Sequence, residues 1–399
     1  MGETVTVADY MRDALTHPDV GYYTQPSSGD GAVFGADGDF VTSPEISQMF
    51  GELVGVWAAT VWQSLGRPKR LRLVELGPGR GTLMDDLIRA AASVPGLGDA
   101  LEVHLVEVSA SLRAMQRRTI CGDEDGDGER VAHASSTGSP VMWHGALSDV
   151  PGGDDVPAVH VAHEFFDALP VHQLHRTPHG WREAIVGPEP NPASPRHLRL
   201  YLSRDVTPAS LREEGRSPMG APGARSRVER CLAGEAIAVE LARRVGRDGG
   251  AALVVDYGRD GPYDDSLVAI RRHGGAHPLS RPGRQDLTAW VDFNALRTAA
   301  EGAALSSSSA SLLSPSPPAP APVAVHGPVE QGLLLRRLGI DARLASLLRS
   351  ATPKQAEALR IGHARLTGGG GGGMGRSYLA LAIASSNLGT PVGFEVGVP

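Results

Sequence analysis

Residues 74–82 read Val-Glu-Leu-Gly-Pro-Gly-Arg-Gly-Thr, and this stretch decides the fold. The apolar residues of 71–76 lead into it and are typical of a short buried strand, whereas apolar residues in 82–90 recur at helical spacing. The three glycines between them permit a sharp turn and let a ligand lie against the backbone without meeting a β-carbon. The sequence therefore predicts strand, tight turn and helix, with the free N–H groups of the helix facing a ligand.

The spacing of these glycines separates two classes of cofactor. A dinucleotide fingerprint, G-x-G-x-x-G, needs its third glycine where this chain has Thr82, and the spacing here is G-x-G-x-G. An acid, Glu75, precedes the turn, and a second strand, 101–106, ends in Glu107, which is placed to accept both ribose hydroxyls. A plain strand-to-helix turn with a solvated Glu107 is the alternative.

This combination resembles class I S-adenosylmethionine-dependent methyltransferases. The resemblance implies S-adenosyl-L-methionine as cofactor, and it implies no metal. The residues expected to bind the cofactor lie in the turn and at the two strand ends: Glu75, Gly77, Pro78, Gly79, Gly81 and Glu107.

Further strands are expected at 140–144, 156–162 and 251–258, with helices between them. Alternating strands and helices predict an α/β fold, Rossmann-like, with a mostly parallel twisted sheet and helices on both faces. We expect a helical cap over 1–66 and a methyltransferase core over 67–300, with an insertion near 187–223 that holds one strand. The low-complexity segment 301–325 is expected to be disordered, and 326–399 to add helices and a closing strand to the same domain.

Local signals refine this outline. Thr6 is expected to cap a first helix, and Ser43, followed by Pro44 and Glu45, to cap a second. The segment 42–45 is a candidate lining of the cofactor pocket. Two more helices are expected over 329–348 and 353–366. The acidic loop 123–128 begins like a calcium loop but lacks the closing glutamate, so a solvated loop is expected there.

Composition excludes several classes of function. The 399 residues carry a formal net charge of -7, which argues against a general nucleic-acid binder. No apolar run reaches the roughly 18–20 residues that span a bilayer, so no membrane insertion is expected. The two cysteines, Cys121 and Cys231, lie far apart without metal-ligand spacing and suggest a reducing compartment.

Four blocks of sequence identify a more specific resemblance. Residues 38–52, 74–82, 163–170 and 256–258 are similar to those of the MidA-like proteins, and the similarity covers nearly the whole chain from Val5 onward. The mitochondrial members of that family are protein-arginine methyltransferases required for assembly of respiratory complex I. The resemblance implies a location in the mitochondrial matrix and a protein substrate, an arginine in a complex I subunit modified to symmetric dimethylarginine. A homodimer is left open.

The block 163–170 supplies the candidate catalytic residues. Glu164 and Asp167 are three positions apart, so on a helical turn they would share a face. They follow a predicted strand, where the ligand crevice of a doubly wound sheet lies. A carboxylate pair can hold an arginine guanidinium and accept its proton. We expect Glu164 as the main guanidinium ligand, Asp167 as its helper, and His163 as an orienting group. Capping or an ion pair with a nearby arginine is the structural alternative.

Three other functions remain open at this stage. A methyltransferase could act on another acceptor, because neither the fold nor the turn names the nucleophile. An assembly chaperone could bind the cofactor without turnover. A nicotinamide-dependent oxidoreductase is disfavoured by the glycine spacing.

Overall fold

The computed structural model describes residues 4–25, 32–34, 38–40, 42–122, 131–218, 225–271, 274–310, 322–370 and 372–395. The chain divides into two compact units, each built from three separate stretches of sequence. Unit 1 comprises 1–40, 166–236 and 259–295, and unit 2 comprises 41–165, 237–258 and 296–399. The sequence predicts continuous segments with boundaries at 66, 300 and 325, whereas each of these units combines separate stretches of the chain. The predicted division into segments stays a prediction.

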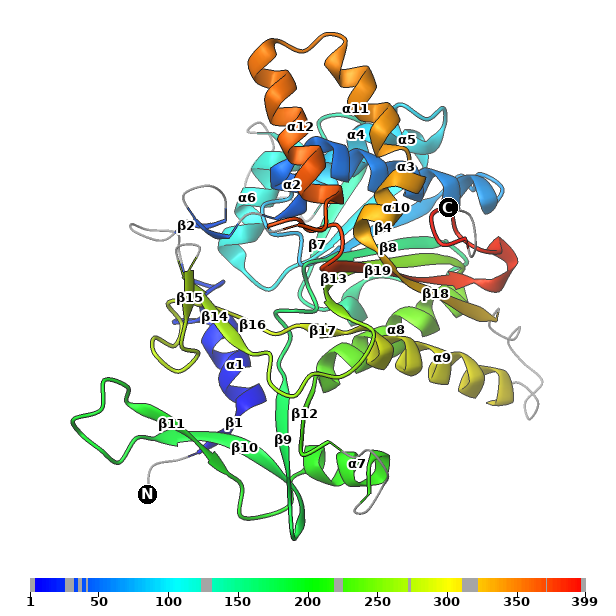
Figure 1. Ribbon diagram of the computed structural model, residues 1–399. Helices are drawn as coiled ribbons and strands as arrows, with labels where there is room; N and C mark the ends of the chain where they lie inside the picture. Colours follow the sequence, from blue (N-terminus) through cyan, green and yellow to red (C-terminus); the bar gives the residue numbers. More distant parts are fainter. Residues whose placement is uncertain are drawn as a thin grey trace. The chain divides into compact units, whose positions relative to one another are not determined.

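Unit 2 is organised around one mixed sheet, whose strands lie in the order β18-β19-β13-β8-β4-β5-β7-β6 (Figure 1). Its five central strands are parallel to one another, as the alternating pattern predicts: β13 (Gly250–Arg259), β8 (Ala158–His163), β4 (Leu71–Leu76), β5 (Leu101–Val106) and β7 (Pro140–His144). Antiparallel strands complete both edges: β18 (Val323–Glu330), β19 (Tyr378–Ser385) and β6 (Ala132–His133). Leu76 of β4 is in register with Val106 and with Ala162, so three strands end together and present their next residues at one edge.

Helices cover both faces of this sheet. One face packs its apolar side chains against α3 (Gln48–Ser64), α4 (Thr82–Ala92) and α10 (Gln331–Arg337). The opposite face is covered by α8 (Leu232–Asp248), whose side chains Leu241 and Val245 are buried. The remaining helices of the unit are α2 (Ser43–Ile46), α5 (Leu97–Ala100), α6 (Ala110–Cys121), α9 (Phe293–Ala310), which begins in unit 1, α11 (Ile340–Leu348) and α12 (Pro353–Thr367), with short 3-10 turns at Leu147–Asp149 and Ser386–Leu388. The predicted fold class is confirmed.

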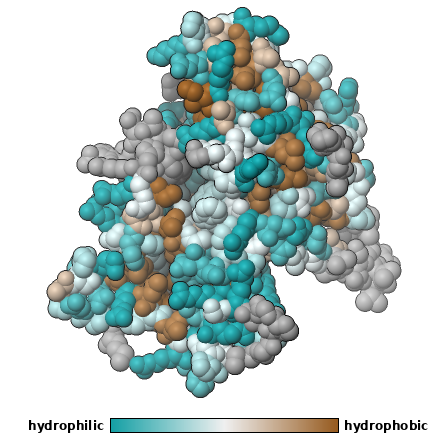
Figure 2. Space-filling model, viewed as in Figure 1, coloured by the Kyte–Doolittle hydropathy of each residue, from teal (hydrophilic) through white to brown (hydrophobic). Residues whose placement is uncertain are grey.

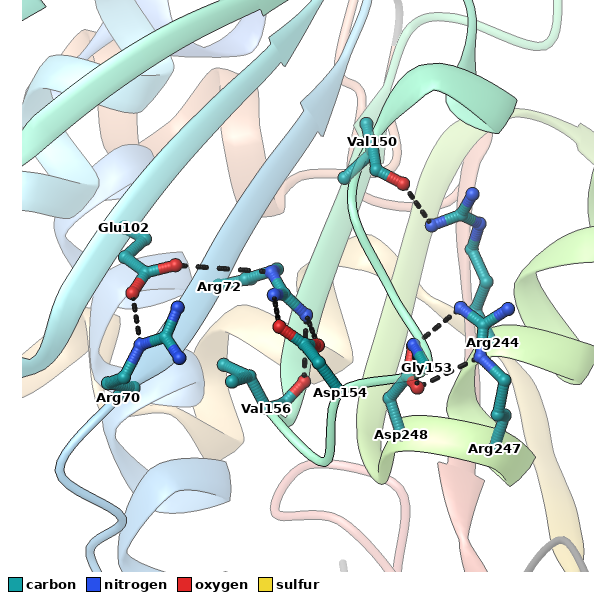
Figure 3. Close-up of polar contacts among 10 residues, drawn as sticks. All are labelled: Arg70, Arg72, Glu102, Val150, Gly153, Asp154, Val156, Arg244, Arg247 and Asp248. Atoms are coloured by element: carbon teal, nitrogen blue, oxygen red, sulfur yellow. Dashed lines mark hydrogen bonds and ion pairs between the residues drawn. The ribbon is translucent and has the colours of Figure 1, made fainter. Parts of the chain in front are cut away.

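The amino ends of the parallel strands are joined by a network of arginines and acids (Figure 3). Arg72 is buried in β4, and its guanidinium donates to both oxygens of Asp154, at 2.7 and 2.5 Å. This bidentate bond holds the pKa of Asp154 at about 2. Arg70 pairs with Glu102, and Arg244 donates to the carbonyl of Val150. Each arginine drawn there has a carboxylate or carbonyl partner, which suits a structural role for this edge of the sheet.

Unit 1 is built from antiparallel strands. One sheet has the order β1-β10-β9-β12 with β11 beside β10: β1 (Val5–Thr6), β10 (Gly180–Pro188), β9 (His172–Thr177), β12 (Arg227–Arg230) and β11 (Leu198–Leu202). A smaller sheet contains β15 (Gly274–Ala276), β14 (Val268–Arg271) and β16 (Asp286–Thr288), and β2 (Ala32–Phe34) pairs with β3 (Gly38–Phe40). Helix α1 (Val7–Thr16) buries Met11 and Leu15, while α7 (Pro208–Arg216) and β17 (Val291–Asp292) complete the elements.

Apolar side chains on the surface lie in separate groups among hydrophilic ones on the face shown in Figure 2. In unit 1 the edge strand β11 exposes Leu200 and Leu202. Among the described helices, none is long and apolar enough to cross a bilayer.

Several local expectations are confirmed and others are wrong. Thr6 caps α1, and its side chain accepts from the N–H of Asp9. Ser43 does not cap a helix: Thr42 precedes the short α2, and Ser47 caps α3 by accepting from Met49. The helix expected over 329–348 is in fact the end of β18, then α10 and α11, which Gly339 separates at a φ of 96°.

The low-complexity and insertion segments also differ from expectation. Of the segment 301–325, residues 301–310 continue α9 and 323–325 begin β18 instead of being disordered. Residues 311–321 lie outside the described residues, as does the acidic loop 123–128. The insertion near 187–223 contains α7 besides the expected strand.

The close approach of α3 to α4 generates a test of the packing in unit 2. A β-carbon on Gly51 would lie 2.4 Å from the β-carbon of Asp86 on α4. We expect Gly51→Ala to force the helices apart and to lower the free energy of unfolding by about 1–3 kcal/mol, measured by urea denaturation. Gly215→Ala in α7 is the control, since nothing lies within 4 Å of its added carbon and the helix gains about 0.5–1 kcal/mol. Equal urea midpoints for the two variants would contradict the packing argument.

Candidate functional site

The glycine turn follows β4 directly and is held in a conformation that favours glycine. Gly77, Gly79 and Gly81 have φ values of 63°, 52° and 83°, in the left-handed region. The Gly77 N–H donates to the carbonyl of Val106 on the neighbouring strand, and the Gly81 N–H donates to Pro78 within the turn. Gly81 is also the N-cap of α4. The predicted strand, turn and helix are therefore present at the carboxyl end of the sheet.

Glu107, the expected ribose acid, is buried and fixed by two donors. One carboxylate oxygen accepts from the Ser109 N–H at 2.8 Å, and the other accepts from the Gln116 side-chain amide at 3.2 Å. Gln116 also donates to the carbonyl of Gly79 at 2.8 Å and accepts from the indole of Trp143 at 3.0 Å. Gln116 thus joins the acid to the glycine turn. Sequence reasoning missed this residue, because only the fold brings α6 to the turn.

Glu75 is the site residue whose environment most clearly requires a ligand. It is 3% exposed, and its Oε2 has no hydrogen-bond partner among the described residues. Burial raises the pKa of Glu75 to about 8, and the charge of Glu107 adds to the rise. A buried acid with an unsatisfied oxygen is costly unless a donor arrives. The amino and hydroxyl groups of S-adenosylmethionine are such donors, so these residues fit the expected cofactor.

Phe165 links the turn to the candidate catalytic segment. A β-carbon on Gly77 would lie 2.7 Å from the Phe165 ring, so glycine is required there for space as well as for φ. The Phe165 N–H donates to Asp256 Oδ2, and Asp256, fully buried at the end of the neighbouring strand β13, also accepts from the Tyr257 N–H. Asp256 is therefore a structural support for the segment that follows β8.

Glu164 is the first residue after β8, and its backbone is strained. Its φ is 47°, unusual for a residue with a β-carbon, and its N–H donates to Val255 on β13. Its side chain is 11% exposed. Oε1 accepts from the Ser43 N–H at 3.1 Å and lies 3.4 Å from the Ser43 hydroxyl. Ser43, which sequence reasoning assigned to a helix cap, instead positions the candidate catalytic carboxylate.

His163 lies beside Glu164 in the position of an orienting group. Its Nε2 is 3.2 Å from Glu164 Oε1, within the distance of an ion pair, but the two atoms are not aligned for a hydrogen bond. The ring packs on Phe50 of α3, with ring centres 4.7 Å apart.

Asp167 belongs to unit 1, and the expected helical face that it would share with Glu164 is not formed. Residues 164–170 adopt bends and a turn, which begin at the positive φ of Glu164. Within its own unit, Asp167 accepts from the Thr288 hydroxyl at 2.7 Å, and its carbonyl accepts from the Ala289 N–H. Its role as helper stays a prediction.

A second carboxylate of unit 2 lies near Glu164. Glu45, in α2, is two residues from Ser43, and burial together with the charge of Glu164 raises its pKa, while the Thr42 N–H and Arg80 lower it. Arg80 comes from the glycine turn, and its Nη1 is 3.7 Å from Glu45 Oε1. In the part of the chain described, no group of three or more His, Cys, Asp or Glu side chains could hold a metal ion.

Comparisons with known proteins agree with this geometry. The family model described as "Putative S-adenosyl-L-methionine-dependent methyltransferase" matches residues 53–310. The zebrafish (Danio rerio) mitochondrial protein arginine methyltransferase NDUFAF7 is 40% identical over 358 residues, which cover 88% of this chain and 76% of the relative. The human (Homo sapiens) protein of the same name is 38% identical, covering 90% of this chain and 76% of the relative.

Solved structures show the same fold. A protein from Burkholderia thailandensis, crystallised with S-adenosyl-homocysteine, superposes with a TM-score of 0.75 at 25% identity, over 99% of this chain and 91% of that one. The family expected from the sequence is confirmed by these matches. The chain belongs to the family of S-adenosyl-L-methionine-dependent methyltransferases, and S-adenosyl-L-methionine is its cofactor.

Proposed function

We propose that this chain is a protein-arginine N-methyltransferase that forms symmetric dimethylarginine on a subunit of respiratory complex I in the mitochondrial matrix. The observation that carries the proposal is Glu164: a partly buried carboxylate on a strained backbone, bonded to Ser43 and next in sequence to Phe165, whose ring packs on the glycine turn. Strain of this kind is retained where surrounding contacts over-determine it, which is common at active sites.

The cofactor would be held by the turn and the two buried acids. We assign Gly77, Pro78, Gly79 and Gly81 to the backbone surface that receives it, Glu107 to its ribose, and Glu75 to its amino-acid end. When bound, S-adenosylmethionine supplies a methyl group on a sulfonium; the methyl passes to the acceptor nitrogen, the C–S bonding pair stays on sulfur, and the nitrogen gives up one proton.

The chain's own contribution is to hold the acceptor and to take that proton. A guanidinium is planar and presents five N–H donors, so a fixed carboxylate can orient it through charge-assisted hydrogen bonds. The Ser43 N–H fixes Glu164 Oε1 on one side, and His163 Nε2 lies 3.2 Å from the same oxygen, which leaves the carboxylate pre-organised for this contact. Glu164 would then accept the proton released from the acceptor nitrogen. Positioning of this kind is the main source of rate in a direct transfer.

The names of the relatives support arginine as the acceptor and the mitochondrion as the location. Complex I as the partner is what the resemblance to the MidA-like proteins implies.

The cofactor assignment is tested by calorimetric titration with S-adenosylmethionine and, separately, with NAD. We expect the first to bind and the second not to bind. Gly81→Ala should weaken binding at least tenfold, because its added carbon would lie 3.2 Å from Gln116 Cα. Gly66→Ala is a matched control: its φ is the same 83°, and nothing lies within 4 Å of its added carbon. Equal losses in both variants would indicate general backbone strain rather than damage to the site.

The catalytic assignment is tested by Glu164→Gln, which keeps an acceptor oxygen for Ser43 while removing the charge. We expect kcat to fall at least about a hundredfold, because general acid–base catalysis contributes factors of about 10²–10⁴. Affinity for S-adenosylmethionine should stay within twofold. Transfer of labelled methyl groups to arginine peptides measures kcat, and calorimetry measures the affinity for S-adenosylmethionine. Full activity in the variant would rule out the assigned role.

The buried acid of the cofactor site predicts a dependence of stability on pH. The pKa of Glu75 is about 8 in the folded chain against an ordinary value of 4.5. Between these values the unfolded chain loses its proton while the folded chain keeps it, so the free energy of unfolding falls as pH rises. We expect Glu75→Gln to raise the stability of the ligand-free protein by about 2 kcal/mol at pH 8, much less at pH 5, and to weaken cofactor binding. Urea denaturation at both pH values, with calorimetry, measures these effects. An advantage independent of pH would contradict the explanation.

A further inference from the structure

The acid that best complements Glu164 within unit 2 is Glu45. Ser43 brings α2 to Glu164, since both its N–H and its hydroxyl lie within 3.4 Å of Oε1. Two residues later in the same turn, Glu45 carries a side chain that is only 13% exposed. The Thr42 N–H donates to Glu45 Oε2 at 3.2 Å, which fixes the carboxylate from one side. Two partly buried carboxylates thus accept from the N–H groups of the consecutive residues Thr42 and Ser43.

Two such acids repel each other unless a cation lies between or beside them. Among the described residues, Arg80 of the glycine turn is paired with Glu45, and its guanidinium lies 3.7 Å from Glu45 Oε1. That distance is too long for a hydrogen bond, and the Arg80 side chain is 47% exposed. Exposed ion pairs of this kind contribute little free energy. The nearby His163 Nε2, on a side chain 5% exposed, also makes no hydrogen bond among the described residues.

We propose that Glu45 is the second carboxylate that receives the acceptor guanidinium together with Glu164, and that the acceptor displaces Arg80 from Glu45. This inference rests on the proposed function, since it requires arginine as the acceptor. A guanidinium held by two fixed carboxylates gains directed N–H···O bonds that Arg80 does not make with Glu45. Glu45 is then a binding residue, and Arg80 is an internal guanidinium that keeps the pair of acids partly neutralised before the substrate arrives.

The experiment compares KM and kcat for an arginine peptide, chosen from a degenerate peptide library by methylation with the wild-type protein. Three variants are measured with it: Glu45→Gln, Arg80→Ala, and Glu52→Gln as the matched control. Glu52 lies on the neighbouring helix α3, and both its carboxylate oxygens accept from Arg343. Affinity for S-adenosylmethionine is measured by calorimetry for each variant, which also shows that the variant is folded.

We expect Glu45→Gln to raise the peptide KM at least tenfold, with cofactor affinity within twofold of wild type. Arg80→Ala should lower the peptide KM by two- to fivefold, because it removes the guanidinium that competes with the substrate for Glu45. Glu52→Gln should change neither the peptide KM nor the affinity for S-adenosylmethionine. The citrulline counterpart of the peptide, which lacks the charge, should bind wild type and Glu45→Gln equally weakly as a competitive inhibitor.

Different results overturn different claims. If wild type methylates arginine peptides but Glu45→Gln keeps its KM within twofold, the inference is wrong and the proposed function stands. If Asp167→Asn raises KM instead, Asp167 is the second carboxylate. If Arg80→Ala raises KM as much as Glu45→Gln does, Arg80 supports the acceptor rather than competing with it. If wild type binds the cofactor but methylates no arginine peptide in the library, both the proposed function and this inference fail.

Discussion

The packing of the Phe165 ring against the α-carbon of Gly77 is the contact on which the site depends. It brings together the turn after β4 and the segment after β8, two strands that are neighbours in the sheet. Gly77 must have a positive φ and must lack a side chain, and Phe165 must be held by Asp256 so that its ring reaches the turn. The Glu164 N–H donates to Val255, the residue before Asp256 on β13. The cofactor surface and the candidate catalytic carboxylate are therefore positioned by contacts with the same strand.

Burial of acidic side chains is the cost of this arrangement. Glu75, Glu107 and Glu164 all lie at the carboxyl edge of the sheet with little exposure. At the amino edge the terminal nitrogens of the buried Arg72 donate to Asp154 and Val156, and its Nε, which makes no hydrogen bond among the described residues, lies 4.0 Å from Glu102. The two edges differ in how their charges are satisfied. At the amino edge the partners come from the chain itself, which suits a structural role. At the carboxyl edge an oxygen of Glu75 has no partner among the described residues, which suits a site completed by a ligand.

The sequence predicts the parts of this structure that depend on neighbouring residues. The glycine turn, the cap of α1 by Thr6 and the parallel strands follow from local spacing, and all are present. The contacts of Gln116 with Glu107 and of Ser43 with Glu164 join positions 9 and 121 apart, so no local pattern contains them. Glu164 and Asp167 do not share a helical face, because a helix requires a negative φ and Glu164 has a φ of 47°. Strand β18 was missed because it contains Pro328, which an edge strand with a bulge tolerates.

The order of strands has a consequence for synthesis of the chain. β13 pairs on one side with β8 and on the other with β19, the last strand of the sheet to leave the ribosome. Until residue 385 has emerged, the apolar strand β13 has an open edge, and such edges are templates for pairing with other chains. The central sheet can therefore be completed only after residue 385 has been translated, although β13 begins at residue 250. During that interval the nascent chain exposes an apolar strand edge on which intermolecular pairing can begin.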